Sequence, residues 1–359
     1  MPSCVLLLPG ALLPAPVASE VLRHAQTPVL AELLRGAQAP VRAQLAPTET
    51  LANAAHLAWL WRVIGHRDGV PITAPYAWNA LGGPTLATEM WRARPCHFAL
   101  ARDHMLLESL VGDPPSQAEL DARAPALRAA AREAGFQLQE TDGQWFLARK
   151  TDWPLKVRPW ESQLGATVGP ESAQGEAQLA WRKLLNEVQM AWFAAGLHRE
   201  REDAERRSFN GVWIEGGGRL EHLPPSNFRA VLANDETARG WALAAGISAE
   251  RVRRLQNHWP EAPKGDLLAV IDDLAEAHRS EDWGAWLAAL PALETRIKCL
   301  VDAARQRELR SLVLVATGRE WVSTVVRERI GWRFWRHLPA WQRTALSDWL
   351  SEAQADTAT

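Results

Sequence analysis

A glycine triplet followed by an arginine is the first group of residues whose types and spacing suggest chemistry. Gly216, Gly217 and Gly218 can present several backbone N–H groups, and Arg219 places a guanidinium beside them. Such groups together hold phosphate or carboxylate without a metal ion. We expect Arg319, which ends a neighbouring predicted strand, to add positive charge to the same crevice. The alternative is a tight strand-to-loop turn that needs glycine for a positive φ angle.

A basic, aromatic stretch over residues 325–341 is a second candidate surface. Arginines are interleaved there with aromatic residues, among them Arg329, Trp332, Arg333, Trp335 and Arg336. This pattern can bind phosphate backbones and stack on exposed bases. It also suits an amphipathic helix that docks on a protein partner or on the protein's own sheet. The composition favours packing within the protein, with partner and nucleic-acid binding as open alternatives.

Ionisable residues also gather between residues 95 and 104, where Cys96, His97, Asp103 and His104 invite a nucleophile or metal interpretation. No second Cys/His cluster completes the four ligands of a zinc site. The alternative is a pair of hydrogen-bonded, partly buried histidines.

The elements that must position these residues follow from the hydrophobic pattern. Apolar runs at 4–8, 211–214, 267–271 and 312–316 predict buried strands, and helical patterns lie between them, including 237–256 and 284–306. Buried strands that alternate with helices predict an α/β fold with a mainly parallel sheet flanked by helices. Ligands of such sheets gather beyond the carboxyl ends of the strands.

The region between residues 71 and 175 has a different character, with short segments punctuated by proline and glycine. We interpret it as an inserted smaller α+β domain in a core formed by residues 1–70 and 176–359. The following helical pattern, 172–205, ends in a run of charges that is typical of a solvated face.

The composition narrows the class of protein. The 359 residues include 47% hydrophobic residues, and the formal charge is −2. A large core is therefore possible, and no global charge attracts nucleic acid or membranes. Three scattered cysteines, no signal peptide and no long apolar run predict a cytoplasmic protein without membrane association. The 19 tryptophans against one tyrosine favour core packing on long helices over ligand stacking.

The segment 208–219, reading Ser-Phe-Asn-Gly-Val-Trp-Ile-Glu-Gly-Gly-Gly-Arg, resembles the Asn-x-x-Trp-x-x-Gly-x-Gly strand and loop of archaeal-type cofactor-independent phosphoglycerate mutases. These enzymes belong to the alkaline phosphatase superfamily, so the resemblance implies an alkaline-phosphatase-like core. Together with Trp-Arg-Lys-Leu-Leu-Asn-Glu-Val-Gln at 181–189, the segment also resembles the RpfE-type group of uncharacterised bacterial proteins.

The resemblance implies two metal ions held by Asp and His, and a Ser or Thr that accepts the phosphoryl group. Where the family has Asp-Gly after the first strand, this chain has Pro9-Gly10. The family's nucleophile segment resembles Ser-Asp-Thr-Ala-His-Leu-Ala. When it is aligned on Ala55-His56-Leu57-Ala58, Ala52 takes the position of the nucleophilic serine and Asn53 that of the following Asp. A strand near the end of the mutase sequences ends in Ala-Asp-His, whose Asp and His bind metal. The corresponding strand of this chain ends in Thr317-Gly318-Arg319. The run from Asp272 to His278 keeps ligand chemistry, with a helix cap as the alternative.

Three functions remain open. The first is a non-catalytic regulatory or interaction protein, a pseudoenzyme on the mutase frame, that binds a protein partner or a small phosphorylated ligand and needs no cofactor. The second is a phosphomutase or phosphatase of altered mechanism that uses Mn or Mg, with Thr50 as nucleophile and His56, Asp273 or His278 as acid or base. The third is a nucleic-acid-associated protein that acts through the basic, Trp-rich C-terminus.

Overall fold

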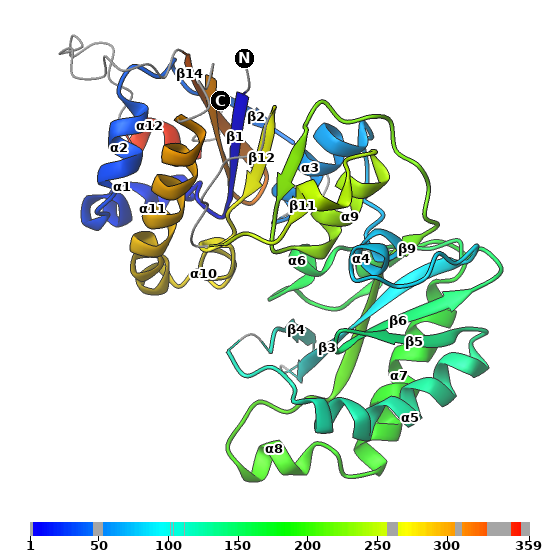
Figure 1. Cartoon of the computed structure of the whole chain (residues 1–359). Helices are drawn as coiled ribbons and strands as arrows, with labels where there is room; N and C mark the ends of the chain where they lie inside the picture. Colours follow the sequence, from blue (N-terminus) through cyan, green and yellow to red (C-terminus); the bar gives the residue numbers. More distant parts are fainter. Residues whose placement is uncertain are drawn as a thin grey trace, which may run out of the picture. The chain divides into compact units, whose positions relative to one another are not determined.

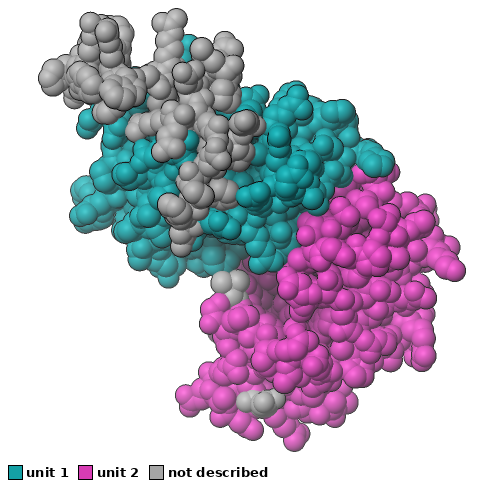
Figure 2. Space-filling model, in the orientation of Figure 1, with its two compact units in different colours: residues 1–68, 222–359 teal, residues 69–221 magenta. Residues whose placement is uncertain are grey.

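The computed structural model describes residues 3–45, 53–100, 102, 104–110, 112–256, 265–305, 311–328 and 346–352. The chain forms two compact units, coloured separately in Figure 2. Unit 1 comprises residues 1–68 and 222–359, and unit 2 comprises residues 69–221.

Unit 1 is built on a seven-stranded sheet in the order β11-β10-β12-β1-β13-β14-β2. The first five strands in this order are parallel, β14 is antiparallel to β13, and β2 is antiparallel to β14. The strands are β1 (Ser3–Pro9), β2 (Val41–Gln44), β10 (Ala230–Leu232), β11 (Val252–Arg253), β12 (Leu267–Val270), β13 (Ser311–Thr317) and β14 (Trp321–Glu328). The expected α/β fold with a mainly parallel sheet is confirmed.

Helices cover both faces of this sheet (Figure 1). One face packs against α1 (Ala15–His24), α2 (Pro28–Leu34), α11 (Trp283–Arg305) and α12 (Leu346–Leu350). The other carries α3 (Ala55–Gly65) and α9 (Glu236–Ala244), whose Trp61 and Trp241 rings lie 5.1 Å apart. Strand side chains alternate between the faces, so Leu6 and Leu8 join the α11 side of the core. A sheet covered on both sides explains the continuous apolar runs.

Unit 2 centres on a long strand, β3 (Glu89–Leu100), with antiparallel neighbours on both sides. Its sheet also contains β4 (Met105–Glu108), β5 (Gln137–Thr141), β6 (Gln144–Arg149) and β9 (Gly211–Gly218). A separate two-stranded sheet pairs β7 (Lys156–Val157) with β8 (Ala173–Gln174). The helices are α4 (Ala74–Ala80), α5 (Gln117–Glu133), α6 (Trp160–Gln163), α7 (Gln178–Ala194) and α8 (Arg199–Asp203).

The boundary of the inserted unit differs from the sequence-based one. It starts close to the expected residue, at 69, but continues to 221 instead of ending at 175. The reason is β9, which we predicted as a strand of the parallel sheet and which pairs antiparallel with β3. Helix α7 packs on β9, and Trp181 Nε1 donates to Ile214 O at 3.0 Å, so both elements belong to unit 2. An apolar run predicts a buried strand but does not name its partner.

Tryptophan fills both cores. The tryptophans whose side chains are almost completely buried include Trp91, Trp181, Trp192, Trp213, Trp241, Trp286 and Trp349. Their burial confirms core packing, but Trp91 and Trp213 lie on β3 and β9 and not on the long helices that we expected. Within the part of the chain that the structure describes, no helix combines the length and the apolar character that crossing a bilayer requires.

Candidate functional site

The carboxyl ends of the parallel strands in unit 1 bring several sequence-predicted residues together. Gly10 follows β1, Asp272 and Asp273 come shortly after β12, and Gly318 and Arg319 follow β13. Strands β12, β1 and β13 are parallel neighbours, so these residues share one edge of the sheet. Ligands bind at this edge in open α/β folds.

Two acids at this edge have different surroundings. Asn234 Nδ2, after β10, donates to Asp272 Oδ1 at 3.3 Å. Burial raises the pKa of Asp272, and the hydrogen bond from Asn234 acts in the opposite direction. Asp273 Oδ1 forms an ion pair with Arg296 at 2.5 Å on α11, while its buried Oδ2 has no hydrogen-bond partner among the described residues.

His278 lies on the short helix α10 (Ala275–Arg279) and is buried. Its Nε2 lies 2.9 Å from Leu12 O. A carbonyl oxygen can only accept, so Nε2 carries the proton and Nδ1 has the lone pair. Burial lowers the pKa of His278 to about 4, and the hydrogen bond to Leu12 acts against this shift. The ring is therefore neutral at pH 7 and is held by the backbone.

Glycine at two of the strand ends is required by packing. Gly10 has a φ angle of +74°, and a Cβ there would lie 2.7 Å from Leu274 O and 2.9 Å from His278 Cβ. A Cβ at Gly318 would lie 2.2 Å from Glu352 Oε1 and 2.7 Å from Leu12 O. The chain's own backbone and side chains thus occupy the space that a side chain would need after β1 and β13.

Arg319 is held by acids of its own unit. Its guanidinium pairs with Glu281, and its backbone N donates to Glu352 Oε1 at 3.0 Å. Its carbonyl accepts from Asn53 N at 2.7 Å. Asn53, with a φ angle of +64°, comes just before α3, so the start of the helix to which the resemblance assigns the nucleophile lies beside Arg319.

The other residues of this helix start are only partly described. His56 is half-buried in the first turn of α3. Thr50 and Ala52 lie outside the described residues. The acid or base candidates Asp273 and His278 therefore share the carboxyl edge, whereas the structure gives no position for the nucleophile candidate.

The described donor set does not fit the two metal ions that the resemblance implies. Pro9 at the end of β1 and Gly318 after β13 have no ligand atom in their side chains, Arg319 is cationic, and the Nε2 of His278 is hydrogen-bonded to Leu12 O. Across the described residues, no group of three or more His, Cys, Asp or Glu side chains is placed to share an ion.

The glycine triplet lies in unit 2, at the end of β9, where packing accounts for all three residues. Gly216 has a φ angle of +68°, and a Cβ there would lie 1.9 Å from Thr73 Oγ1. The Cβ positions of Gly217 and Gly218 would fall on the side chains of Trp91 and Ile72. These contacts agree with the alternative interpretation, a close-packed turn.

Arg219 also has partners in its own unit. Its Nη2 lies 2.6 Å from Asp152 Oδ1 and donates to Lys150 O at 3.0 Å. Arg319 belongs to the other unit. The predicted anion-binding set therefore does not form one site within either unit.

Among the cysteine and histidine candidates of unit 2, Cys96 and His97 are held by their surroundings, whereas His104 is exposed, so only His97 fits the alternative of partly buried histidines. Cys96 is buried, and burial raises the pKa of its thiol well above the usual value, so the thiol stays protonated. His97 Nδ1 lies 2.8 Å from Ser208 O and 3.0 Å from Ser208 Oγ. Because the carbonyl needs a donor, Nδ1 carries a proton and cannot take one from the serine hydroxyl.

Some of the predicted site residues lie outside the part of the chain that the structure describes. They are Asp103 and the basic and aromatic residues Arg329, Trp332, Arg333, Trp335 and Arg336.

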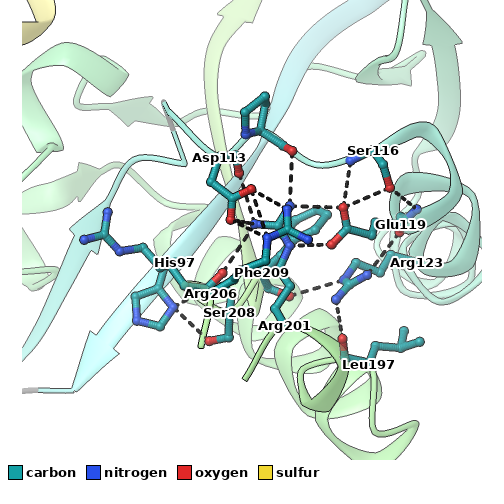
Figure 3. A network of polar contacts seen from close by, with 12 residues as sticks. His97, Asp113, Ser116, Glu119, Arg123, Leu197, Arg201, Arg206, Ser208 and Phe209 are labelled. Atoms are coloured by element: carbon teal, nitrogen blue, oxygen red, sulfur yellow. Dashed lines mark hydrogen bonds and ion pairs between the residues drawn. The ribbon is translucent and has the colours of Figure 1, made fainter. Parts of the chain in front are cut away.

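One polar network was missed by the sequence interpretation, which assigned residues 198–207 to a solvated face. Arg201 is fully buried, and Figure 3 shows its guanidinium between Asp113 and Glu119. Its Nη2 lies 3.0 Å from Glu119 Oε2, and its Nη1 lies 3.1 Å from Asp113 Oδ2. Arg201 lowers the pKa of Glu119 to about 2. The solvated-face interpretation is wrong at Arg201, because acids far away in the sequence surround it.

Comparisons with known proteins give a distant likeness in structure. No family model and no curated protein matches the chain. It is similar to the PH0037 protein from Pyrococcus horikoshii, with 14% identity over 91% of this chain and 87% of that chain and a TM-score of 0.48. It is also similar to a cofactor-independent phosphoglycerate mutase from Thermoplasma acidophilum, with 13% identity, 91% and 89% coverage and a TM-score of 0.37. At these values neither likeness assigns an activity to this chain.

Proposed function

We propose that this chain is a non-catalytic regulatory or interaction protein on a mutase-like frame. The observation that carries the proposal is the closed carboxyl edge of the sheet in unit 1. Pro9 has no ligand atom where the resemblance implies a metal-binding Asp, Gly318 has no space for a ligating side chain, and Arg319 is paired with Glu281. Phosphoryl transfer needs positioned positive charge and an activated nucleophile. This edge instead contains ionisable groups that are largely bonded to one another and to the backbone.

The resemblance of segments 181–189 and 208–219 to the RpfE-type proteins supports the frame, and the regulatory role is inferred from the lack of the residues that the chemistry requires. In this proposal the frame serves recognition, so the chain keeps the fold while it lacks the residues that the chemistry requires. A protein partner or a small phosphorylated molecule is the ligand that such a role needs.

One observation favours a second function, a metal-dependent phosphatase of altered mechanism. The buried Oδ2 of Asp273 has no hydrogen-bond partner among the described residues, and Asp272 adjoins it. An unpaired buried carboxylate oxygen is costly unless something binds it. In this alternative Asp273 contributes to the binding of Mn or Mg.

Turnover measurements separate the two functions. The purified chain is assayed with 3-phosphoglycerate and with p-nitrophenyl phosphate, with and without manganese or magnesium. We expect no turnover above the protein-free rate and no rise in melting temperature on addition of either metal. Metal-dependent turnover that Asp273→Asn abolishes, and that the surface control Arg23→Gln retains, would overturn the proposal and establish the alternative.

A further inference from the structure

A hollow in unit 1 lies at the opposite end of β10 from the carboxyl edge. It has a volume of about 430 Å³ and is bounded by the loop before β10 and by the turn after α9. Leu223 and Ile247 are buried in its wall, and Phe228 is half-buried. His222, Arg229 and Arg251 line it and are exposed, so the hollow has an apolar floor and a basic rim.

Backbone hydrogen bonds hold the walls in place. Leu223 N donates to Ala244 O at 3.0 Å, and Ser226 N donates to Ala245 O at 3.2 Å. Ile247 N donates to Ala242 O at 3.1 Å across the turn. These donors satisfy carbonyls at the C-terminal end of α9, whose partial negative charge would otherwise oppose an anion. The hollow is therefore formed without a ligand.

The charges on the rim are not neutralised by the residues that line it. No acidic side chain is among the lining residues in the described part of the chain. The nearby acid Asp266 accepts from Ser3 N at 2.7 Å, and Glu250 accepts from Ser248 Oγ at 2.9 Å. Arg251 is close enough to lower the pKa of Glu250, but neither Arg229 nor Arg251 has a side-chain hydrogen bond or ion pair with a described residue.

The geometry points to a binding site for a small organic phosphate, with its phosphate group at Arg229 and Arg251 and its apolar or aromatic part over Phe228. Guanidinium groups bind phosphate through two parallel hydrogen bonds, and several of them favour a dianion over a single carboxylate. The volume falls within the range of small-molecule sites and suits a molecule of the size of a nucleoside monophosphate. This site stands independently of the proposed function, because it uses none of the residues of the carboxyl edge.

Calorimetric titration of the full chain with three probes tests the site: adenosine monophosphate, adenosine and inorganic phosphate. We expect adenosine monophosphate to bind more tightly than either fragment, since it reaches both rim and floor. Arg229→Gln combined with Arg251→Gln weakens binding about tenfold or more, because each lost charged hydrogen bond contributes to affinity. The matched control Arg23→Gln, on the exposed surface of the same unit, leaves binding unchanged.

Several calorimetric results would contradict the proposed phosphate site. No heat with adenosine monophosphate, equal binding of adenosine, or full binding by the double variant would each overturn the site. Equal binding of inorganic phosphate would contradict the role of the apolar floor. The turnover assay does not enter this test, so the proposed function and the phosphate site can fail separately.

Discussion

Two regions of this molecule bury ionisable groups, and they do so in different ways. In unit 2, Arg201 is enclosed by Glu119 and Asp113, and each charge has an opposite charge beside it (Figure 3). In unit 1, His278 is buried without an ion-pair partner and stays neutral, held by Leu12 O. Burial of an ionisable group therefore does not by itself mark a functional site. The paired cluster joins segments of unit 2 that are far apart in the sequence, whereas the carboxyl edge lies where this class of fold binds ligands.

Among the variants that test this comparison, we expect the substitution of Arg201 to lower the free energy of unfolding most. Arg201→Met leaves Glu119 buried without its cation, and we expect a loss of about 3–5 kcal/mol in the free energy of unfolding. Urea denaturation at neutral pH measures it. Arg128→Met is the matched control, because the Arg128 side chain is 55% exposed in its pair with Glu140 and contributes about 0–1 kcal/mol. Equal losses in the two variants would show that the Arg201 cluster does not stabilise the fold.

Gly10 tests the closure of the carboxyl edge. Gly10→Ala combines a positive φ angle with contacts below 3 Å to Leu274 and His278, and we expect a loss of about 2–4 kcal/mol in the free energy of unfolding. Gly246→Ala is the control, since its φ angle of +82° is similar and no neighbour lies within 4 Å of the Cβ position. It should lose only about 1–2 kcal/mol. A Gly10 variant no less stable than the control would mean that the edge has room for a side chain.

His278 makes unit 1 sensitive to acid. Its pKa is about 4 in the folded protein, below the usual 6.5. Between these values the unfolded chain binds a proton that the folded chain does not, so stability falls as pH falls below 6.5. From pH 7.5 to pH 5 this amounts to about 2 kcal/mol in the free energy of unfolding. His278→Gln keeps a donor for Leu12 and should lose this part of the pH dependence. An identical pH dependence in the variant would contradict the buried, neutral state.

Arg319 has the smallest expected effect. Its side chain is 43% exposed and that of its partner Glu281 is 57% exposed, so Arg319→Gln should change the free energy of unfolding by at most about 1 kcal/mol. Urea denaturation of this variant and of Arg201→Met under the same conditions compares the two losses in the free energy of unfolding. A loss as large as that of Arg201→Met would place Arg319 in the buried class and remove the distinction between the regions.

Much of the local structure could be predicted from the sequence. The apolar runs marked β1, β12 and β13, and the helical pattern at 284–306 marked α11. The short strand β10 was not predicted, because three residues carry too little pattern. Val325 to Glu328 form the end of β14, a strand in place of the amphipathic helix that we considered for residues 325–341. Interleaved basic and apolar residues fit either element over so few positions.

The candidate site could be predicted only in part. Asp273, His278 and Arg319 share an edge because each follows a strand or lies near its end, which sequence order reveals. The glycine triplet was predicted beside Arg319 because β9 was placed in the wrong sheet. Its membership in unit 2 depends on long-range pairing with β3, which no local pattern encodes. The hollow at His222, Arg229 and Arg251 has no sequence motif, since its lining comes from two separate segments.

Hydrophobic periodicity and side-chain chemistry are local properties, so the sequence predicted the class of fold in unit 1 and the lack of the ligands and nucleophile that the resemblance implies. Pro9, Ala52 and Arg319 cannot supply the ligands or nucleophile that the resemblance implies, whatever surrounds them. The tertiary structure alone decided which charges are buried and paired, and which glycines lack space for a side chain. Those properties depend on contacts between residues far apart in the chain, such as Arg201 with Glu119 and Gly318 with Glu352.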